Sequence, residues 1–203
     1  MAQQQENELK YELEEESYHR LLGLLRPLSE ASDFSNIYFQ AATETGRRDW
    51  VLRLRRFGRE LGGELTLKIG RQLSPGAFTS VEYTERVGSA DPLQWEGTEP
   101  LRVFREEISS GPVLLQGEAR NQRRLMAAPV GPVEGWEVDR TELPNGVICH
   151  ELEIEYPPEA RPTPEELQGF RMLVEEWLFE QDIVPRASDR TKYRRFLESL
   201  GLR

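Results

Sequence analysis

The chain of 203 residues has one cysteine, Cys149, and two histidines, His19 and His150. A single cysteine excludes an intramolecular disulfide and a cluster of thiolate metal ligands. Cys149 and His150 fall in a strand pattern, and His19 falls in an expected surface helix. Neither histidine is placed as a metal ligand or a general base, so we expect no catalytic triad built on serine or cysteine.

Long apolar runs are also missing. No stretch approaches the ~20 apolar residues of a membrane span, and no basic segment followed by an apolar one opens the chain. Acidic residues outnumber basic ones by 36 to 26, and the formal net charge of -10 disfavours nucleic acid or an anionic membrane as partner. We expect a cytoplasmic protein, a monomer or a homodimer, that binds neither.

The composition is that of a folded domain. Hydrophobic residues make up 37% of the chain, close to the globular norm once the 16 glycines are added. No internal repeat, low-complexity block or long linker divides the sequence. We therefore expect a single domain over residues 1–203.

Charged residues alternate with apolar ones in several segments, as they do in β-strands with one polar face. The segments are 6–14, 50–55, 64–69, 81–84 and 151–155. A half-buried strand with one solvated face explains any one of them. Together they sort acids and bases into separate short clusters, and this favours the wall of a charged cavity.

The order of these segments carries a resemblance to a known family. The matches are Glu6-x-Glu8-x-Lys10, Asn36-x-Tyr38-Phe39, Leu52-Arg53-Leu54-Arg55, Leu65-Thr66-Leu67-Lys68, Glu82-Tyr83, Trp136-Glu137-Val138-Asp139, Glu153-Ile154-Glu155 and Lys192-Tyr193. The first resembles the ExExK signature of the CYTH superfamily, the triphosphate tunnel metalloenzymes. ExExK alone is a weak motif, whereas the ordered set is fairly specific and spans almost the whole chain.

The resemblance implies an α+β fold: a closed or nearly closed antiparallel barrel of about eight strands, with helices packed outside and a polar tunnel inside. Barrels of this size fill their interior with side chains or hold one small ligand. Charged side chains inside one need partners, either each other, a metal or a ligand. The fold therefore makes the inward charges candidates for function.

The implied activity is hydrolysis of a triphosphate with Mg²⁺ or Mn²⁺. Inorganic triphosphate is the favoured substrate, because the sequence shows no aromatic pocket for a base or a thiamine ring. A class IV adenylate cyclase or a thiamine triphosphatase would use the same wall with a different leaving group. A non-catalytic phosphate-binding module would keep the bases and lose the second metal.

The resemblance also implies residue roles. Glu6, Glu8 and Glu153 would hold one metal, and Glu8, Glu82 and Glu155 would orient or activate the attacking water, directly or through a second metal. Glu155 and Asp139 are further metal candidates. The residues that would bind the phosphoryl oxygens are Lys10, Arg53, Arg55, Lys68, Arg123 and Lys192.

One strand departs from the family pattern. A Lys-x-Arg pair is expected before the Trp136 segment, and the preferred register has Asn121 in place of the lysine and Arg123 as the arginine. An alternative register would use Arg120 or Arg124, which lie on the opposite face.

Four helices are expected. Ser17 is a candidate cap for a short helix that Pro27 stops, and residues 101–108 favour a helix over a strand. Thr163 opens a capping box before a long amphipathic helix. Ser188 or Asp189 would cap a final short helix that carries Lys192 to a tunnel mouth.

Overall fold

The computed structural model describes residues 2–43, 49–157 and 162–202, and the side chains of those residues except 2–4. Its strands are β1 (Ala2–Leu13), β2 (Ser32–Ala41), β3 (Trp50–Phe57), β4 (Gly63–Ser74), β5 (Ala77–Val87), β6 (Val113–Ala127), β7 (Gly135–Glu142), β8 (Ile148–Glu155) and β9 (Arg186–Ala187). Its helices are α1 (Glu15–Leu24), α2 (Glu99–Glu107), α3 (Pro164–Glu180) and α4 (Lys192–Ser199), with a 3-10 turn at Pro92–Gln94. No described helix has the length and apolar content that crossing a membrane requires.

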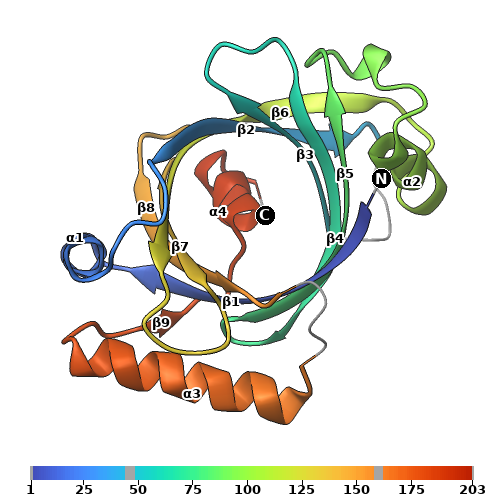
Figure 1. Ribbon diagram of the computed structural model, residues 1–203. Coiled ribbons are helices and arrows are strands. Elements are labelled where there is room, and N and C mark those ends of the chain that lie inside the picture. Colours follow the sequence, from blue (N-terminus) through green and yellow to red (C-terminus); the bar gives the residue numbers. More distant parts are fainter. Residues whose placement is uncertain (1, 44–48, 158–161, 203) are drawn as a thin grey trace.

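Strands β1 to β8 close into one antiparallel barrel, as expected (Figure 1). The order around it is β1, β5, β4, β3, β2, β6, β7 and β8, and β8 returns to β1. The first half of β1 pairs with β5, and its second half pairs with the short β9 on the same side. The predicted closed eight-stranded α+β fold is thus confirmed.

The hydrophobic core lies outside the barrel wall, between the strands and the helices. One cluster joins outward residues of β1, β7 and β8 to α1 and α3, with Trp136 of β7 against Trp177 of α3. A second joins β3 and β4 to α2, where Phe104 and Trp95 are fully buried. Because the apolar face of each strand points outward, the alternating polar face must point into the barrel.

Three helices begin where the sequence indicated or close to it. Thr163 forms the predicted capping box with Glu166, and α2 occupies the segment for which a helix was favoured. Ser17 was wrong as a cap, because α1 already begins at Glu15 and its N-cap is Glu14. The acidic residues of the first turn suit the helix dipole without a side-chain cap.

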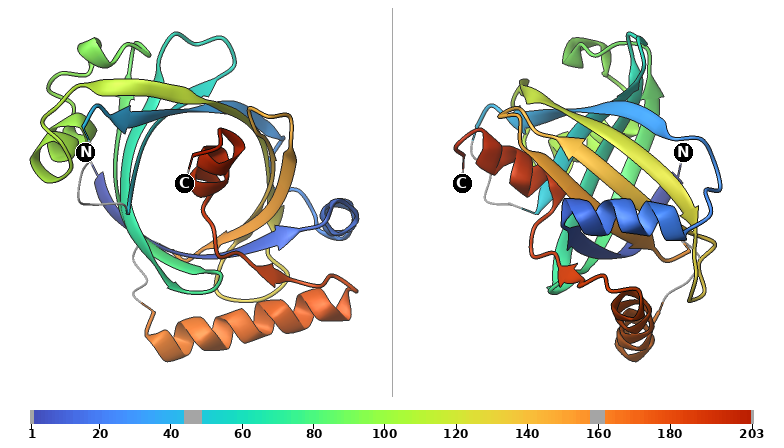
Figure 2. Two further views of the ribbon diagram at one scale, coloured as in Figure 1. Left: turned by 180° about the vertical axis from the view of Figure 1, so that it is seen from behind. Right: turned by 90° about the vertical axis from the view of Figure 1, so that its left-hand side faces the viewer.

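The last helix differs from the prediction in its cap. Thr191 is the N-cap of α4, where its hydroxyl accepts a hydrogen bond from the backbone N–H of Arg194. Ser188 is held by β1 instead, since its N–H donates to the carbonyl of Lys10. While the other helices pack outside the barrel, α4 lies across one of its mouths, where the final helix was expected to bring Lys192 (Figure 2).

Candidate active site

The inner faces of the strands enclose a cavity of about 480 Å³, a size typical of small-molecule sites. Every predicted site residue except Asp139 lines it: Glu6, Glu8, Lys10, Arg53, Arg55, Lys68, Glu82, Arg123, Glu153, Glu155 and Lys192. Asp139 is fully buried behind Arg123 and Lys192, both of which it contacts. The barrel therefore gathers the predicted residues in one place.

Strand register sets acids and bases opposite one another. Glu82 of β5 faces Lys68 of β4, and Glu153 of β8 faces Lys10 of β1. Directly opposed residues on one face have Cβ atoms close enough to interact. Carboxylates also face one another, as Glu8 of β1 faces Glu155 of β8 and Glu137 of β7 faces Glu153.

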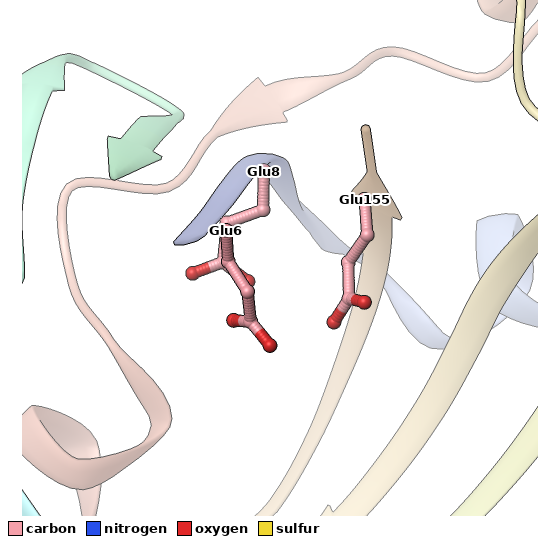
Figure 3. A group of neighbouring side chains, drawn as sticks. All are labelled: Glu6, Glu8 and Glu155. Atoms are coloured by element: carbon pink, nitrogen blue, oxygen red, sulfur yellow. The ribbon is translucent and has the colours of Figure 1, made fainter. Parts of the chain in front are cut away.

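Glu6, Glu8 and Glu155 form the first acidic group, with one carboxylate oxygen of each within 4.8 Å of the others. Their carboxyl groups extend from β1 and β8 toward the same space (Figure 3). Burial, together with neighbouring carboxylates, raises the pKa of Glu6 and of Glu155 to about 7. Burial alone would also raise the pKa of Glu8, but Lys10 and then Lys68 hold it below its usual value.

Such a group suits a hard divalent cation. Mg²⁺ and Mn²⁺ prefer oxygen ligands, and Mg²⁺ commonly uses one or two carboxylates together with substrate phosphates and waters. Glu6 and Glu155 have too little positive charge near them to ionise fully at neutral pH, as their raised pKa values show. A divalent cation bound among the three carboxylates would supply the missing positive charge.

Lys68 links this group to Glu82. Its Nζ lies 2.7 Å from Glu6 Oε2, 3.2 Å from Glu8 Oε1 and 3.0 Å from Glu82 Oε1. Burial would raise the pKa of Glu82, but Lys68 and then Arg53 lower it to about 2. Glu82 is therefore ionised at neutral pH.

A second acidic group, Glu137, Asp139 and Glu153, is already paired with cations. Arg123 contacts all three carboxylates, and Lys192 Nζ lies 2.5 Å from Asp139 Oδ2 and 2.7 Å from Glu153 Oε2. Burial would raise the pKa of Glu153, but Lys10, Lys192 and Arg123 hold it well below its usual value. This group has less need of a metal than the first one.

Two arginines of β3 complete the wall. Neither Arg53 nor Arg55 forms an ion pair with a carboxylate anywhere in residues 2–43, 49–157 and 162–202, and Arg53 Nε is buried without a hydrogen-bond partner there. Burial lowers the pKa of Arg55 to about 10, and the nearby Arg53 and Arg123 lower it too. Burial would lower the pKa of Arg53, but Glu82 raises it without a direct ion pair, so the charge of Arg53 is partly compensated. The charge of Arg55 is compensated less, as its lowered pKa shows.

Sequence reasoning missed some of these contacts. Glu137 shares the inward face of Asp139 by the two-residue period, so the alternation contained a signal for it. Arg195 of α4 contacts the buried Glu151 and Glu12, and nothing in the strand patterns pointed to that partnership. Asn121, which stands where the resemblance expects lysine, is buried and hydrogen-bonds to Asn36 and Thr141.

Neither a protein-family model nor a curated protein sequence matches this chain. Solved structures do match it over nearly its full length. The model resembles HpAC1 from Hippeastrum, a proposed adenylyl cyclase with a dominant triphosphatase activity, at 24% identity and a TM-score of 0.77, over 98% of this chain and 97% of that one. A proposed adenylate cyclase from Bacillus halodurans matches at 19% identity and a TM-score of 0.70, over 97% and 99% of the two chains.

A proposed adenylate cyclase from Vibrio parahaemolyticus has 11% identity and a TM-score of 0.54, over 98% of this chain and 99% of that one. At these identities the matches concern the fold. Together with the closed barrel and its charged interior, they show that this chain has the CYTH-like triphosphate tunnel fold.

Proposed function

We propose that this protein hydrolyses a triphosphate substrate in its barrel with the help of a divalent metal, and that inorganic triphosphate is the preferred substrate. The observation that carries the proposal is one cavity with an acidic group on one wall and, on another, arginines that form no ion pair within the described residues. Phosphoryl transfer depends mainly on positioning and on electrostatic stabilisation. A metal site that faces arginine side chains supplies both the positioning and the electrostatic stabilisation.

Glu6, Glu8 and Glu155 are the proposed ligands of Mg²⁺ or Mn²⁺. When bound, the ion would neutralise phosphoryl oxygens and act as a Lewis acid. Asp139 and Glu153 are secondary candidates, because Arg123 and Lys192 already occupy their oxygens. A second ion there would have to displace those contacts.

The basic residues have a different role in the proposal. Arg53 and Arg55 bind phosphoryl oxygens directly, since neither forms an ion pair with a carboxylate within the described residues. Lys10, Lys68, Arg123 and Lys192 would exchange part of their carboxylate contacts for the substrate. Arginine forks match phosphate geometry and form two parallel hydrogen bonds.

Glu8, Glu82 and Glu155 are the proposed residues that orient or activate the attacking water. Glu82 is ionised and lies beside Lys68, so it can accept a hydrogen bond from a water next to the bound phosphate. The proton leaves the water for a carboxylate oxygen as the new oxygen–phosphorus bond forms and the anhydride bond breaks. Orthophosphate and pyrophosphate are the products from inorganic triphosphate.

Adenylate cyclase activity is the second candidate, because two of the matched structures are named as proposed adenylate cyclases and HpAC1 as a proposed adenylyl cyclase. A cyclase would use the ribose hydroxyl of ATP in place of water and release pyrophosphate with a cyclic nucleotide. Thiamine triphosphatase activity and simple phosphate binding are further alternatives for the same wall.

Phosphorus NMR separates these activities. The protein is incubated with Mg²⁺ or Mn²⁺ and, in turn, inorganic triphosphate, ATP and thiamine triphosphate. The proposal predicts fastest release of orthophosphate from inorganic triphosphate. Cyclic AMP from ATP with inorganic triphosphate left intact would favour the cyclase, and binding without turnover of any substrate would favour the binding module.

Two variants tie the activity to the site. Glu8→Gln should be nearly inactive while folded, because it removes a ligand of the acidic group. Glu176→Gln, which changes an exposed carboxylate on α3, should behave as the wild type. Equal activity in both variants would place the chemistry elsewhere.

A further inference from the structure

The inner face of β2 lies beside Arg55 and Arg123 of the cavity wall and contributes no charged side chain there. Phe34 and Asn36, two residues apart, both lie on this face, and Asn36 is the cross-strand partner of Arg55. The guanidinium carbon of Arg55 lies 4.4 Å from the centre of the Phe34 ring, and that of Arg123 lies 5.9 Å from it. Phe34 is only 5% exposed. One aromatic ring therefore contacts two of the proposed phosphate-binding arginines.

The two arginines differ in how the protein compensates them. Arg123 contacts Glu137, Asp139 and Glu153. Arg55 has no carboxylate partner within the described residues, and its Nε donates only a long hydrogen bond of 3.4 Å to Asn36 Oδ1. A carboxylate would orient this guanidinium and also neutralise it. The face of an aromatic ring attracts a cation through its quadrupole and leaves the charge available to a ligand.

The amide of Asn36 is itself oriented by a chain of neutral groups. Its Nδ2 donates to Asn121 Oδ1 at 3.2 Å, and Asn121 Nδ2 donates to Thr141 Oγ1 at 2.8 Å. With its Nδ2 used in this way, Asn36 must present Oδ1 to Arg55. Asn121 thus contributes to the wall without adding another positive charge beside Arg55 and Arg123.

We propose that Phe34 and Asn36 are positioning residues, which hold the Arg55 guanidinium in a fixed orientation, still charged, for the phosphoryl oxygens of the bound triphosphate. The inference rests on the proposed function and adds the device that keeps one cation ready for substrate. A flexible arginine would have to be ordered on binding, whereas one held by a ring and an amide loses less entropy.

The first experiment asks whether the ring holds the arginine, independently of any substrate. Arginine Nε–H signals are recorded by NMR in the wild type, in Phe34→Leu and in Phe34→Tyr. The ring should shift the Arg55 signal, the tyrosine variant should keep the shift, and the leucine variant should lose it. An Arg55 signal unchanged in Phe34→Leu would overturn the positioning.

The second experiment measures affinity for inorganic triphosphate by calorimetry in chelator. A cation–π contact of this kind corresponds to about a fivefold change, so Phe34→Leu should bind about fivefold more weakly and Phe34→Tyr should recover most of the loss. Phe57→Leu is the matched control, because Phe57 packs against Phe34 with ring centres 5.8 Å apart, whereas the ring under the guanidinium groups of Arg55 and Arg123 is that of Phe34. Equal losses in Phe34→Leu and Phe57→Leu would mean that Phe34 acts through general packing.

A double-mutant cycle gives the decisive comparison. In an Arg55→Ala background, Phe34→Leu should cause a much smaller further loss of triphosphate affinity, limited to its more distant contact with Arg123, and the same fivefold loss there would overturn the inference. If Phe34→Leu does not fold, Asn36→Asp replaces it: the new carboxylate should neutralise Arg55 and weaken triphosphate binding, with less effect when Arg55 is absent. A wild type that binds no triphosphate would overturn the proposed function, and the NMR result would still show whether the ring holds Arg55.

Discussion

Replacing Lys68 by methionine removes the cation that Glu6, Glu8 and Glu82 share. Its Nζ lies 2.7 Å, 3.2 Å and 3.0 Å from their respective oxygens. Breaking a buried ion pair by removing one partner costs about 3–5 kcal/mol, and the 21% exposure of the lysine side chain places the loss near the lower end. For a chain of 203 residues, about 3 kcal/mol corresponds to a fall in Tm of roughly 6–12 °C.

The loss should depend on pH with a defined sign. The pKa of Glu82, which burial would raise, is lowered by Lys68 and then Arg53 from 4.5 to about 2. A carboxylate with a depressed pKa stabilises the fold above its unfolded pKa, and the contribution disappears as the pH falls through the folded pKa. The difference in Tm between wild type and Lys68→Met should therefore be full at pH 7 and shrink as the pH falls from 4.5 toward 2.

Thermal unfolding followed by circular dichroism, first in chelator and then with increasing Mg²⁺ or Mn²⁺, tests this prediction. Lys68→Arg keeps the charge and serves as the control. A metal that binds only the folded state adds about 2.7 kcal/mol at a hundred times its Kd, so saturating metal should restore most of the stability of Lys68→Met. A Tm within 2 °C of wild type in chelator at pH 7 would refute the buried charge network, given the ~6 °C minimum expected.

Three further results are expected. Chelator should abolish triphosphate hydrolysis and Mg²⁺ or Mn²⁺ should restore it, whereas full activity in excess chelator would exclude the metal role. Metal affinity, measured by calorimetry, should rise between pH 6 and 8 by roughly tenfold for each of Glu6 and Glu155. Both carboxyl groups have a pKa of about 7, and each must lose its proton to bind the metal. An affinity that does not change with pH would mean that other residues are the ligands. Arg55→Ala should raise the KM for triphosphate at least ~10-fold by loss of a charged hydrogen bond, and the exposed Arg59→Ala should not, so equal KM values would place Arg55 outside the binding wall.

The sequence predicted the faces of the strands well because their signal is periodic, while the closed barrel followed from the resemblance to the CYTH superfamily. A two-residue period fixes which side chains share a face, so Glu6 could be placed with Glu8 on β1, and Glu153 with Glu155 on β8, before the strands were paired. That the two pairs meet followed from the resemblance. The preferred register around Asn121 also agrees with the structure, in which Arg123 lines the cavity and Asn121 is buried among polar groups.

Contacts across the barrel were beyond the reach of the pattern. Periodicity gives a face to each residue but does not say that Arg123 meets three carboxylates of β7 and β8. It also gives no position to a helix that follows the last strand. Lys192 was expected near a tunnel mouth, yet its partners, Asp139 and Glu153, follow only from where α4 lies.

The chain has an acidic net charge, yet its proposed substrate is an anion. The two are compatible because acidic and basic side chains lie on different parts of the barrel wall. Inside the barrel, Asp139, Glu137 and Glu153 neutralise Arg123 as long as no substrate is bound. Arg55 meets a ring and an amide, and its charge therefore remains for a ligand. A buried charge without a partner lowers the stability of the fold, so binding an anion beside it brings the largest gain in free energy. Asn36 is the test of this reading, because an aspartate at that position would stabilise the empty barrel and weaken the bound one.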